Sequence, residues 1–220
     1  MGMRDLVSYR FTEKTISPTT IFHKPGGRAE IVVGLPVRYR RDYVICLLNH
    51  ELGTHFLRKF NENKQVWFQN RKKFKLGKYL MTEEGLASIH MLYEQAIQAP
   101  FKPFLFQAAL NYFSAYLASF MGFSELFMTL KKYVKDEEKL WRQCMRVKRG
   151  KLRSTDWFPG LKNTATGGGM FKDQVYLRGA FELLSQRKEI DFKALYAGKL
   201  SLKDFKKMEK KGFIKSGTSY

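Results

Sequence analysis

The spacing of hydrophobic and polar positions changes along the chain, from short β-type runs near the N-terminus to helical periodicity further on. Two β-type runs, 21–24 and 30–34, enclose Pro25-Gly26-Gly27 and predict a hairpin. From about 40 to 61, apolar side chains recur with the helical period, at positions 44, 45, 47, 48 and 52. Residues 1–20 are polar and unpatterned. The pattern therefore predicts a small antiparallel sheet followed by a long helix.

Most of the remaining chain has helical character. Thr82 is a candidate N-cap, and the helix that it begins should end near Gln98. The most apolar stretch, 104–127, is long enough for a bilayer span, but polar side chains surround it and favour a buried core helix. Two further helices are expected over about 124–148 and 173–186. The predicted fold class is α+β, mainly helical, with a small antiparallel β-hairpin or sheet beside the first helix.

Charge distinguishes this chain from an ordinary globular protein. Its 220 residues include 40 lysines and arginines but only 20 acidic residues, which gives a formal net charge of +20 at pH 7. Such a surplus predicts a partner with negative charge: nucleic acid, an anionic membrane or an acidic protein surface. No zinc-finger, RNP or helix-turn-helix signature accompanies it, so we expect no nucleic acid partner. We also expect no membrane partner and a monomeric chain. Two cysteines, Cys46 and Cys144, are too few for a disulfide framework and indicate a reducing compartment.

The segment His50-Glu51-Leu52-Gly53-Thr54-His55 carries the candidate chemistry. In zinc hydrolases, two histidines of one helix bind the metal, and the glutamate after the first histidine activates the metal-bound water. Here the histidines are five positions apart, and an ideal α-helix would set them roughly 140° apart. A π-bulge with i→i+5 bonding would bring them together, and a glycine within it tolerates the distortion. The alternative is two histidines on different faces by chance.

A catalytic zinc needs a third protein ligand, and the residues alone leave its identity open. The candidates are His23, His90, Glu83 and Glu84. The two glutamates lie about 100° apart on a helix, so at most one of them can point at the metal. They could instead simply complement the helix dipole. We expect the histidine rings and the carboxylate to converge beside the second strand of the hairpin.

Five segments of the chain together identify a family. They are Pro-Gly-Gly-Arg-Ala-Glu-Ile-Val-Val-Gly-Leu (25–35), His-Glu-Leu-Gly-Thr-His-Phe-Leu-Arg (50–58), Thr-Glu-Glu-Gly-Leu-Ala-Ser (82–88), Lys-Asp-Gln-Val-Tyr-Leu (172–177) and Ile-Asp-Phe (190–192). From about residue 20 to 195, the chain thereby resembles the microtubule-associated tyrosine carboxypeptidase family. The chain is short for this family, and its basic connection between the first helix and Thr82 is a departure.

The resemblance implies an activity, a cofactor and a location. The activity is that of a zinc metallocarboxypeptidase that removes the C-terminal tyrosine from α-tubulin, in the cytoplasm and on the microtubule cytoskeleton. The ligands of Zn²⁺ would be His50, His55 and Glu84, and Glu51 would be the general base. The implied organisation is an N-terminal segment (1–20), a metallopeptidase domain (21–198) and a basic C-terminal tail (199–220).

An exopeptidase also needs a cation that holds the terminal carboxylate of its substrate. Arg58, Lys172 and Arg178 are candidates for this role, and each could equally be a solvated or structural cation. Tyr176 could donate a hydrogen bond to the oxyanion, or it could be a packed helix residue.

The basic runs give the charge a rationale. The runs 71–75, 131–135, 148–153 and 206–211 could steer the acidic α-tubulin tail and the microtubule surface towards the site, although some are solvated helix faces. The alternative function is that of a catalytically incomplete microtubule-binding protein with the same fold.

Overall fold

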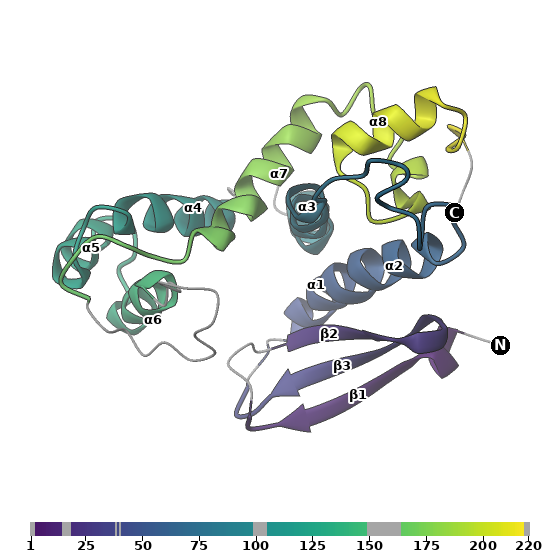
Figure 1. Ribbon diagram of the computed structural model, residues 1–220. Coiled ribbons are helices and arrows are strands. Elements are labelled where there is room, and N and C mark those ends of the chain that lie inside the picture. Colours follow the sequence, from purple (N-terminus) through teal and green to yellow (C-terminus); the bar gives the residue numbers. More distant parts are fainter. Residues whose placement is uncertain are drawn as a thin grey trace. The chain divides into compact units, whose positions relative to one another are not determined.

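The computed structural model describes residues 3–14, 19–37, 39, 41–98, 105–148 and 164–217 (Figure 1). The chain divides into two compact units. The first combines Met1–Lys102 with Gly179–Tyr220, and the second is Pro103–Arg178. Helices dominate both units, and the only sheet among the described residues has three strands, which confirms a mainly helical α+β fold.

The sheet has the order β1-β3-β2, with strands β1 (Val7–Thr12), β2 (Thr19–Lys24) and β3 (Arg28–Gly34). The expected hairpin is formed by β2 and β3, which pair antiparallel around a turn at Pro25–Gly27. Two consecutive glycines in this turn, Gly26 and Gly27, have φ of 72°, a conformation that favours glycine.

The N-terminal strand β1 was not expected, because residues 1–20 showed no pattern. It pairs parallel to β3, so the sheet is mixed rather than purely antiparallel. Its large side chains Tyr9 and Phe11 are exposed, and they belong to an edge strand without a buried face. A strand of this kind has no alternation of buried and exposed positions that would distinguish it in the sequence.

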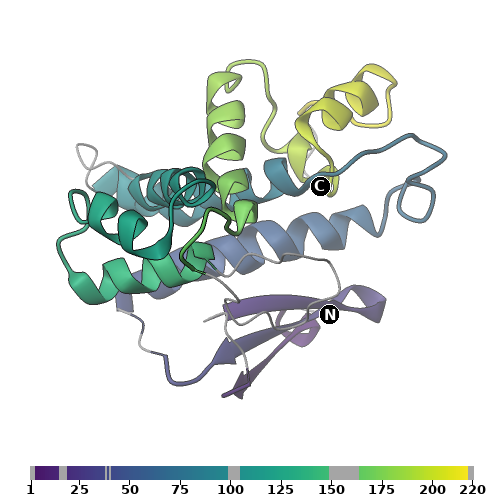
Figure 2. The ribbon, with the colours of Figure 1, turned by 60° about the vertical axis from the view of Figure 1, so that its left-hand side comes forward.

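One continuous helical rod lies beside the sheet. It consists of α1 (Arg41–His50), a π-helical segment (Glu51–Phe56) and α2 (Leu57–Glu62). The next helix, α3 (Leu80–Gln98), packs against α1 and the π-helical segment, and strand β2 contacts the same segment. Figures 1 and 2 show the sheet on one side of the rod and α3 on the other.

Thr82 is not the N-cap of its helix. The helix begins at Leu80, and the Thr82 hydroxyl accepts a hydrogen bond from the backbone N–H of Leu202 at 2.9 Å. This contact joins α3 to the start of α8 (Leu202–Lys210). The described helix extends to Gln98, where we expect its end, and the next residues lie outside the described part of the chain.

The C-terminal residues contribute to the core of the first unit, although their sequence reads as a basic tail. Leu202, Phe205 and Met208 are spaced by three on one face of α8 and are buried, as is Ile214. They join a cluster built around Trp67. The lysines of α8 occupy its other faces, and their number hides the short apolar stripe.

In the second unit, each of the two long helices expected over 104–127 and 124–148 is divided. The helices are α4 (Phe106–Ala118), α5 (Phe123–Leu130) and α6 (Glu137–Lys148). The first break is at Gly122, which is extended and lies so close to Ala165 that a Cβ would come 2.4 Å from its carbonyl oxygen. The second break is at Asp136, which accepts a hydrogen bond from the N–H of Lys139 as an N-cap.

These helices enclose a core of their own, which includes Leu126, Leu130, Leu140 and Cys144. The predicted core helix thus becomes two shorter core helices. None of the described helices is long and apolar enough to span a membrane.

Two glycines let α3 approach the part of α7 (Gln174–Ser185) that belongs to the first unit. A Cβ on Gly85 would lie 2.2 Å from the carbonyl carbon of Gly179, and one on Gly179 would lie 1.9 Å from the carbonyl oxygen of Met81. Real Cβ atoms do not approach backbone so closely, so only glycine fits at both positions. This crossing fixes the first turns of α3, which carry Glu83 and Glu84.

The crossing predicts a steric cost for Gly179→Ala. We expect the variant to lose about 1–3 kcal/mol of stability, because the added methyl forces two packed backbones apart. The measurement is the free energy of unfolding by denaturant. The control is Gly77→Ala, whose Cβ would make only an ordinary contact of 3.7 Å with Asp204. Equal losses in both variants would contradict the steric explanation.

Candidate metal centre

The distorted helix that the five-residue spacing requires is present. Residues Glu51–Phe56 form a π-helix, and the N–H of Leu57 donates to the carbonyl of Leu52, five residues earlier. This geometry brings the Nε2 atoms of His50 and His55 within 3.2 Å of each other. The prediction of i→i+5 bonding between the two histidines is therefore confirmed.

Glu84 completes a group of three donors. Its Oε2 lies 3.8 Å from Nε2 of His50 and 3.6 Å from Nε2 of His55. Ligand atoms about 2.0–2.1 Å from a tetrahedral zinc are separated by roughly 3.3 Å, close to all three separations here. The arrangement of two imidazole nitrogens and one carboxylate oxygen can therefore hold a single small cation.

Glu83 supports the histidines from outside this group. Its Oε1 is 2.9 Å from Nδ1 of His55, the ring nitrogen that does not face His50. A carboxylate at this position fixes the orientation of a ligating imidazole. Arg58 and Lys199 also pair with Glu83. Burial would raise the pKa of Glu83, but Arg58, the hydrogen bond with His55 and Lys199 hold it well below its usual range.

Arg58 does not suit the substrate-binding role that the sequence suggested for it. Its side chain is fully buried, and its guanidinium donates to Glu83 and to the carbonyls of Leu195 and Leu200. It therefore faces the protein interior, and a substrate carboxylate cannot reach it. The sequence placed it one helical turn after His55 but could not show which face of the helix is buried.

The two imidazoles differ in their electrostatic environment. Burial, with a contribution from the neighbouring ring, lowers the pKa of His50 to about 4. Burial also acts on His55, but hydrogen bonds to Glu83 and Glu84 outweigh it and raise the pKa of His55 to about 9. The carboxylates thus create a negative potential where the two Nε2 atoms face each other, and this favours a cation.

Glu51 lies beside the histidines and is buried. Burial raises the pKa of Glu51 to about 7, although a hydrogen bond with the backbone of Ile21 opposes the shift. A carboxylate with a pKa near neutrality can both accept and release a proton. Ile21 belongs to β2, the first strand of the hairpin, so the expectation that the site adjoins the second strand is wrong.

Two other histidines that were candidate ligands lie outside the group of three. Nε2 of His23 is 3.3 Å from Nζ of Lys199. Burial, followed by this lysine, lowers the pKa of His23 to about 4. His90 instead contacts the hydroxyls of Thr54 and Tyr196. Sequence reasoning missed Lys199 and Tyr196, because their contacts span more than 100 residues.

The remaining candidates for substrate binding belong to the second unit. Lys172 and Arg178 are exposed, and Tyr176 is half-buried. Their roles stay predictions. Of the basic run 148–153, only Lys148 lies within the described residues. Its buried ammonium donates to four backbone carbonyls, so it is a structural cation.

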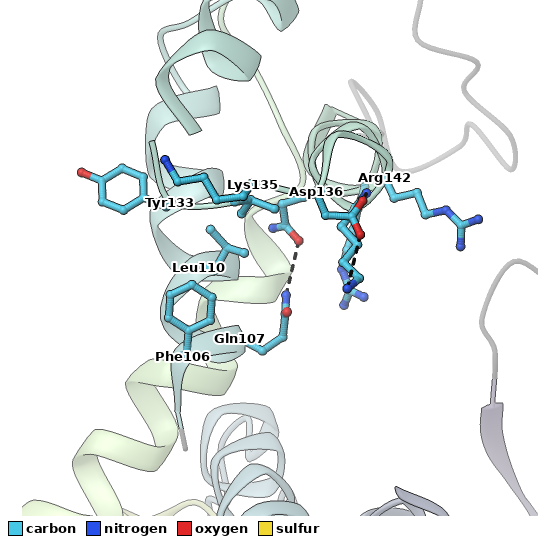
Figure 3. A pocket seen from close by; sticks show the side chains of 11 residues that line it. Phe106, Gln107, Leu110, Tyr133, Lys135, Asp136 and Arg142 are labelled. Atoms are coloured by element: carbon cyan, nitrogen blue, oxygen red, sulfur yellow. Dashed lines mark hydrogen bonds and ion pairs between the residues drawn. The ribbon is translucent and has the colours of Figure 1, made fainter. Parts of the chain in front are cut away.

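A pocket of about 460 Å³ also lies in the second unit, between α4, α6 and the turn before α6. Its lining mixes aromatic side chains, amides and cations. Figure 3 shows that the side chains of Lys135 and Arg142 extend in opposite directions, so these cations do not converge. Arg142 and Arg146 are also paired with carboxylates. The group in the first unit is therefore the stronger candidate for chemistry.

The group of donors defines a candidate metal site, in which a helix that carries His-Glu-x-x-x-His faces a carboxylate on the next helix. Comparison with known proteins gives the class, that of carboxypeptidases: the family described as "Microtubule-associated tyrosine carboxypeptidase" matches residues 25–216. The chain belongs to this family.

Three relatives illustrate the extent of the match. The chain is 39% identical over 178 residues to microtubule-associated tyrosine carboxypeptidase 1 of Rattus norvegicus. The aligned region covers 80% of this chain and 35% of the relative. It is 38% identical over 178 residues to the Homo sapiens protein of the same name, with the same coverage. It is 40% identical over 173 residues to MATCAP2 of Mus musculus, covering 77% of this chain and 30% of the relative. The chain thus spans about a third of the length of these relatives.

The burial of Arg58 predicts a structural phenotype for Arg58→Met. We expect a loss of about 3 kcal/mol or more in the free energy of unfolding, because Glu83 keeps its buried charge without its main partner. Arg142→Met is the control, since it removes an exposed ion pair of little energetic value. A variant of Arg58 with the unfolding midpoint of the wild type would show that its buried contacts are dispensable.

Proposed function

We propose that this chain is the catalytic part of a zinc-dependent carboxypeptidase that removes the C-terminal tyrosine from α-tubulin. The observation that carries the proposal is the convergence of His50, His55 and Glu84, whose donor atoms all lie within 4.8 Å of one another. Two imidazoles and one carboxylate are a common protein ligand set of catalytic zinc, which leaves one position for water or substrate. Membership of the family supports the reaction and the tubulin substrate.

Each residue around the metal has a distinct task. A zinc ion held by the three ligands would act as a Lewis acid that activates water and polarises the scissile carbonyl. Glu51 accepts a proton from the attacking water and later delivers it to the amine of the departing tyrosine. Glu83 keeps the ring of His55 oriented through Nδ1.

The basic surface supports an acidic partner such as the α-tubulin tail and the microtubule surface. In the first unit, Lys207 donates to the carbonyls of Phe74 and Lys75, so α8 packs against the basic run 71–75. Exposed lysines of both segments therefore share one region, with Lys72 and Lys73 on the loop. Clustered positive charge accelerates association with an acidic substrate.

The proposal predicts one zinc ion per chain. We expect stoichiometric zinc after metal-free purification and reconstitution, as measured by elemental analysis. His55→Ala should abolish this binding, because it removes one of three ligands. His23→Ala is the matched control and should retain the metal, because His23 lies outside the group of donors. A wild-type chain without zinc would refute the metal site.

The proposed role of Glu51 predicts that Glu51→Gln retains zinc but loses hydrolysis. The amide cannot accept the proton of the attacking water, so the release of tyrosine from an α-tubulin tail peptide should fall about 100-fold or more. Turnover close to that of the wild type would eliminate Glu51 as the base. Normal zinc and microtubule binding without tyrosine release by the wild-type chain would favour the catalytically incomplete alternative.

A further inference from the structure

Three polar side chains form a network at the π-helical segment, outside the group of metal donors. Thr54 belongs to the segment itself, His90 to α3 and Tyr196 to the short helix Ala194–Ala197. The Tyr196 hydroxyl lies 2.9 Å from Nδ1 of His90, and the Thr54 hydroxyl lies 3.2 Å from the same nitrogen. The mechanism proposed above uses none of them.

The π geometry explains why this network is needed. In an α-helix, the carbonyl of Gly53 would accept a hydrogen bond from the N–H of Leu57. Here the acceptors of that N–H are the carbonyls of Leu52 and Thr54 instead. The Tyr196 hydroxyl donates to the carbonyl of Gly53 at 2.8 Å and replaces the α-helical donor. The Thr54 hydroxyl likewise donates to the carbonyl of Asn49 at 3.2 Å.

The protons of the network can be assigned consistently. Both hydroxyl protons point to backbone carbonyls, so both hydroxyl oxygens are available as acceptors. A neutral His90 that carries its proton on Nδ1 can donate to these two oxygens and to the Gly53 carbonyl, with which it also forms a hydrogen bond. Burial lowers the pKa of His90, which favours the neutral ring, and burial raises the pKa of Tyr196 to about 12, which keeps its proton in place.

Tyr196 is itself held rigidly. Its backbone carbonyl accepts a hydrogen bond from Nδ2 of Asn61 at 3.1 Å, and the preceding carbonyl of Leu195 accepts one from Arg58. Both donors belong to α2, the helix that continues the π-helical segment. The hydroxyl is therefore aimed at Gly53 from a fixed support.

We infer that Tyr196 is a positioning residue for the metal centre: its hydroxyl stabilises the π turn at Gly53 and so keeps His50 and His55 on one ion. Without the hydroxyl, the Gly53 carbonyl keeps His90 but loses Tyr196 as a donor, so the return of Leu57 to α-helical bonding becomes more favourable. That change rotates His55 by about 100° relative to His50 and separates the two rings. The inference rests on the proposed zinc site, although the effect on the helix does not require the metal.

The test is Tyr196→Phe, which removes only the hydroxyl. Zinc affinity of the full chain is measured by competition with a chromophoric chelator, and we expect it to fall about 10–100-fold, as for other outer partners of metal ligands. A second measurement, on the metal-free chain, is the NMR cross-peak between the ring protons of His50 and His55. It should be present in the wild type and lost in the variant. Tyr43→Phe is the matched control, because it removes a hydroxyl that contacts the sulfur of Met91 at 3.9 Å.

A second pair of variants guards against simple misfolding of Tyr196→Phe. Thr54→Val removes the other hydroxyl and should weaken zinc binding, whereas Thr54→Ser keeps the hydroxyl and should restore it. The inference would be overturned if both Tyr196→Phe and Thr54→Val left the zinc affinity and the cross-peak between the two rings unchanged. A wild-type chain that binds no zinc, but whose cross-peak depends on Tyr196, would refute the proposed function and uphold only the role of Tyr196 in stabilising the π turn and the pairing of the two rings.

Discussion

The five-residue separation of His50 and His55 is the constraint on which the first unit depends. An α-helix would set these positions roughly 140° apart, whereas the π-helical segment brings their Nε2 atoms to 3.2 Å. A π turn displaces backbone carbonyls from their α-helical donors, and a buried carbonyl without a donor is costly. The fold therefore brings in donors from elsewhere. One of them, Tyr196, lies 143 residues after the carbonyl that it serves.

The two glutamates of α3 are positioned beside the histidines by a close contact between α3 and α7. Gly85 and Gly179 allow α3 and α7 to touch, and this contact fixes the turn of α3 that carries two consecutive glutamates. Because consecutive helical residues point about 100° apart, only Glu84 faces both Nε2 atoms. Glu83 turns to Nδ1 of His55 and is neutralised by buried cations. Two identical residues thus perform different tasks because of their position on one helix.

The sequence predicted those parts of the site that lie within one helix or one motif. The spacing of the two histidines required a π-bulge, and the family resemblance selected Glu84 over its neighbour. The sequence could not predict contacts between residues that are distant along the chain. Arg58 had the charge for a substrate carboxylate, but it faces Leu195 and Leu200, which are distant in sequence. Helix ends were missed where a single residue decides them, as at the extended Gly122, because a long apolar run outweighs one glycine in any periodicity argument.

Burial of the site also changes the surface that a partner meets. Among the described residues, six acidic side chains are buried but only three basic ones: Glu51, Glu62, Glu83, Glu84, Asp173 and Asp204 against Arg58, Lys148 and Lys199. Three of these acids, Glu51, Glu83 and Glu84, lie at the group of donors, where Arg58 and Lys199 offset part of their charge. Burial therefore removes more negative than positive charge from the surface of the described residues, although the basic composition of the chain is the larger contribution. A surface with a positive surplus favours the approach of acidic partners.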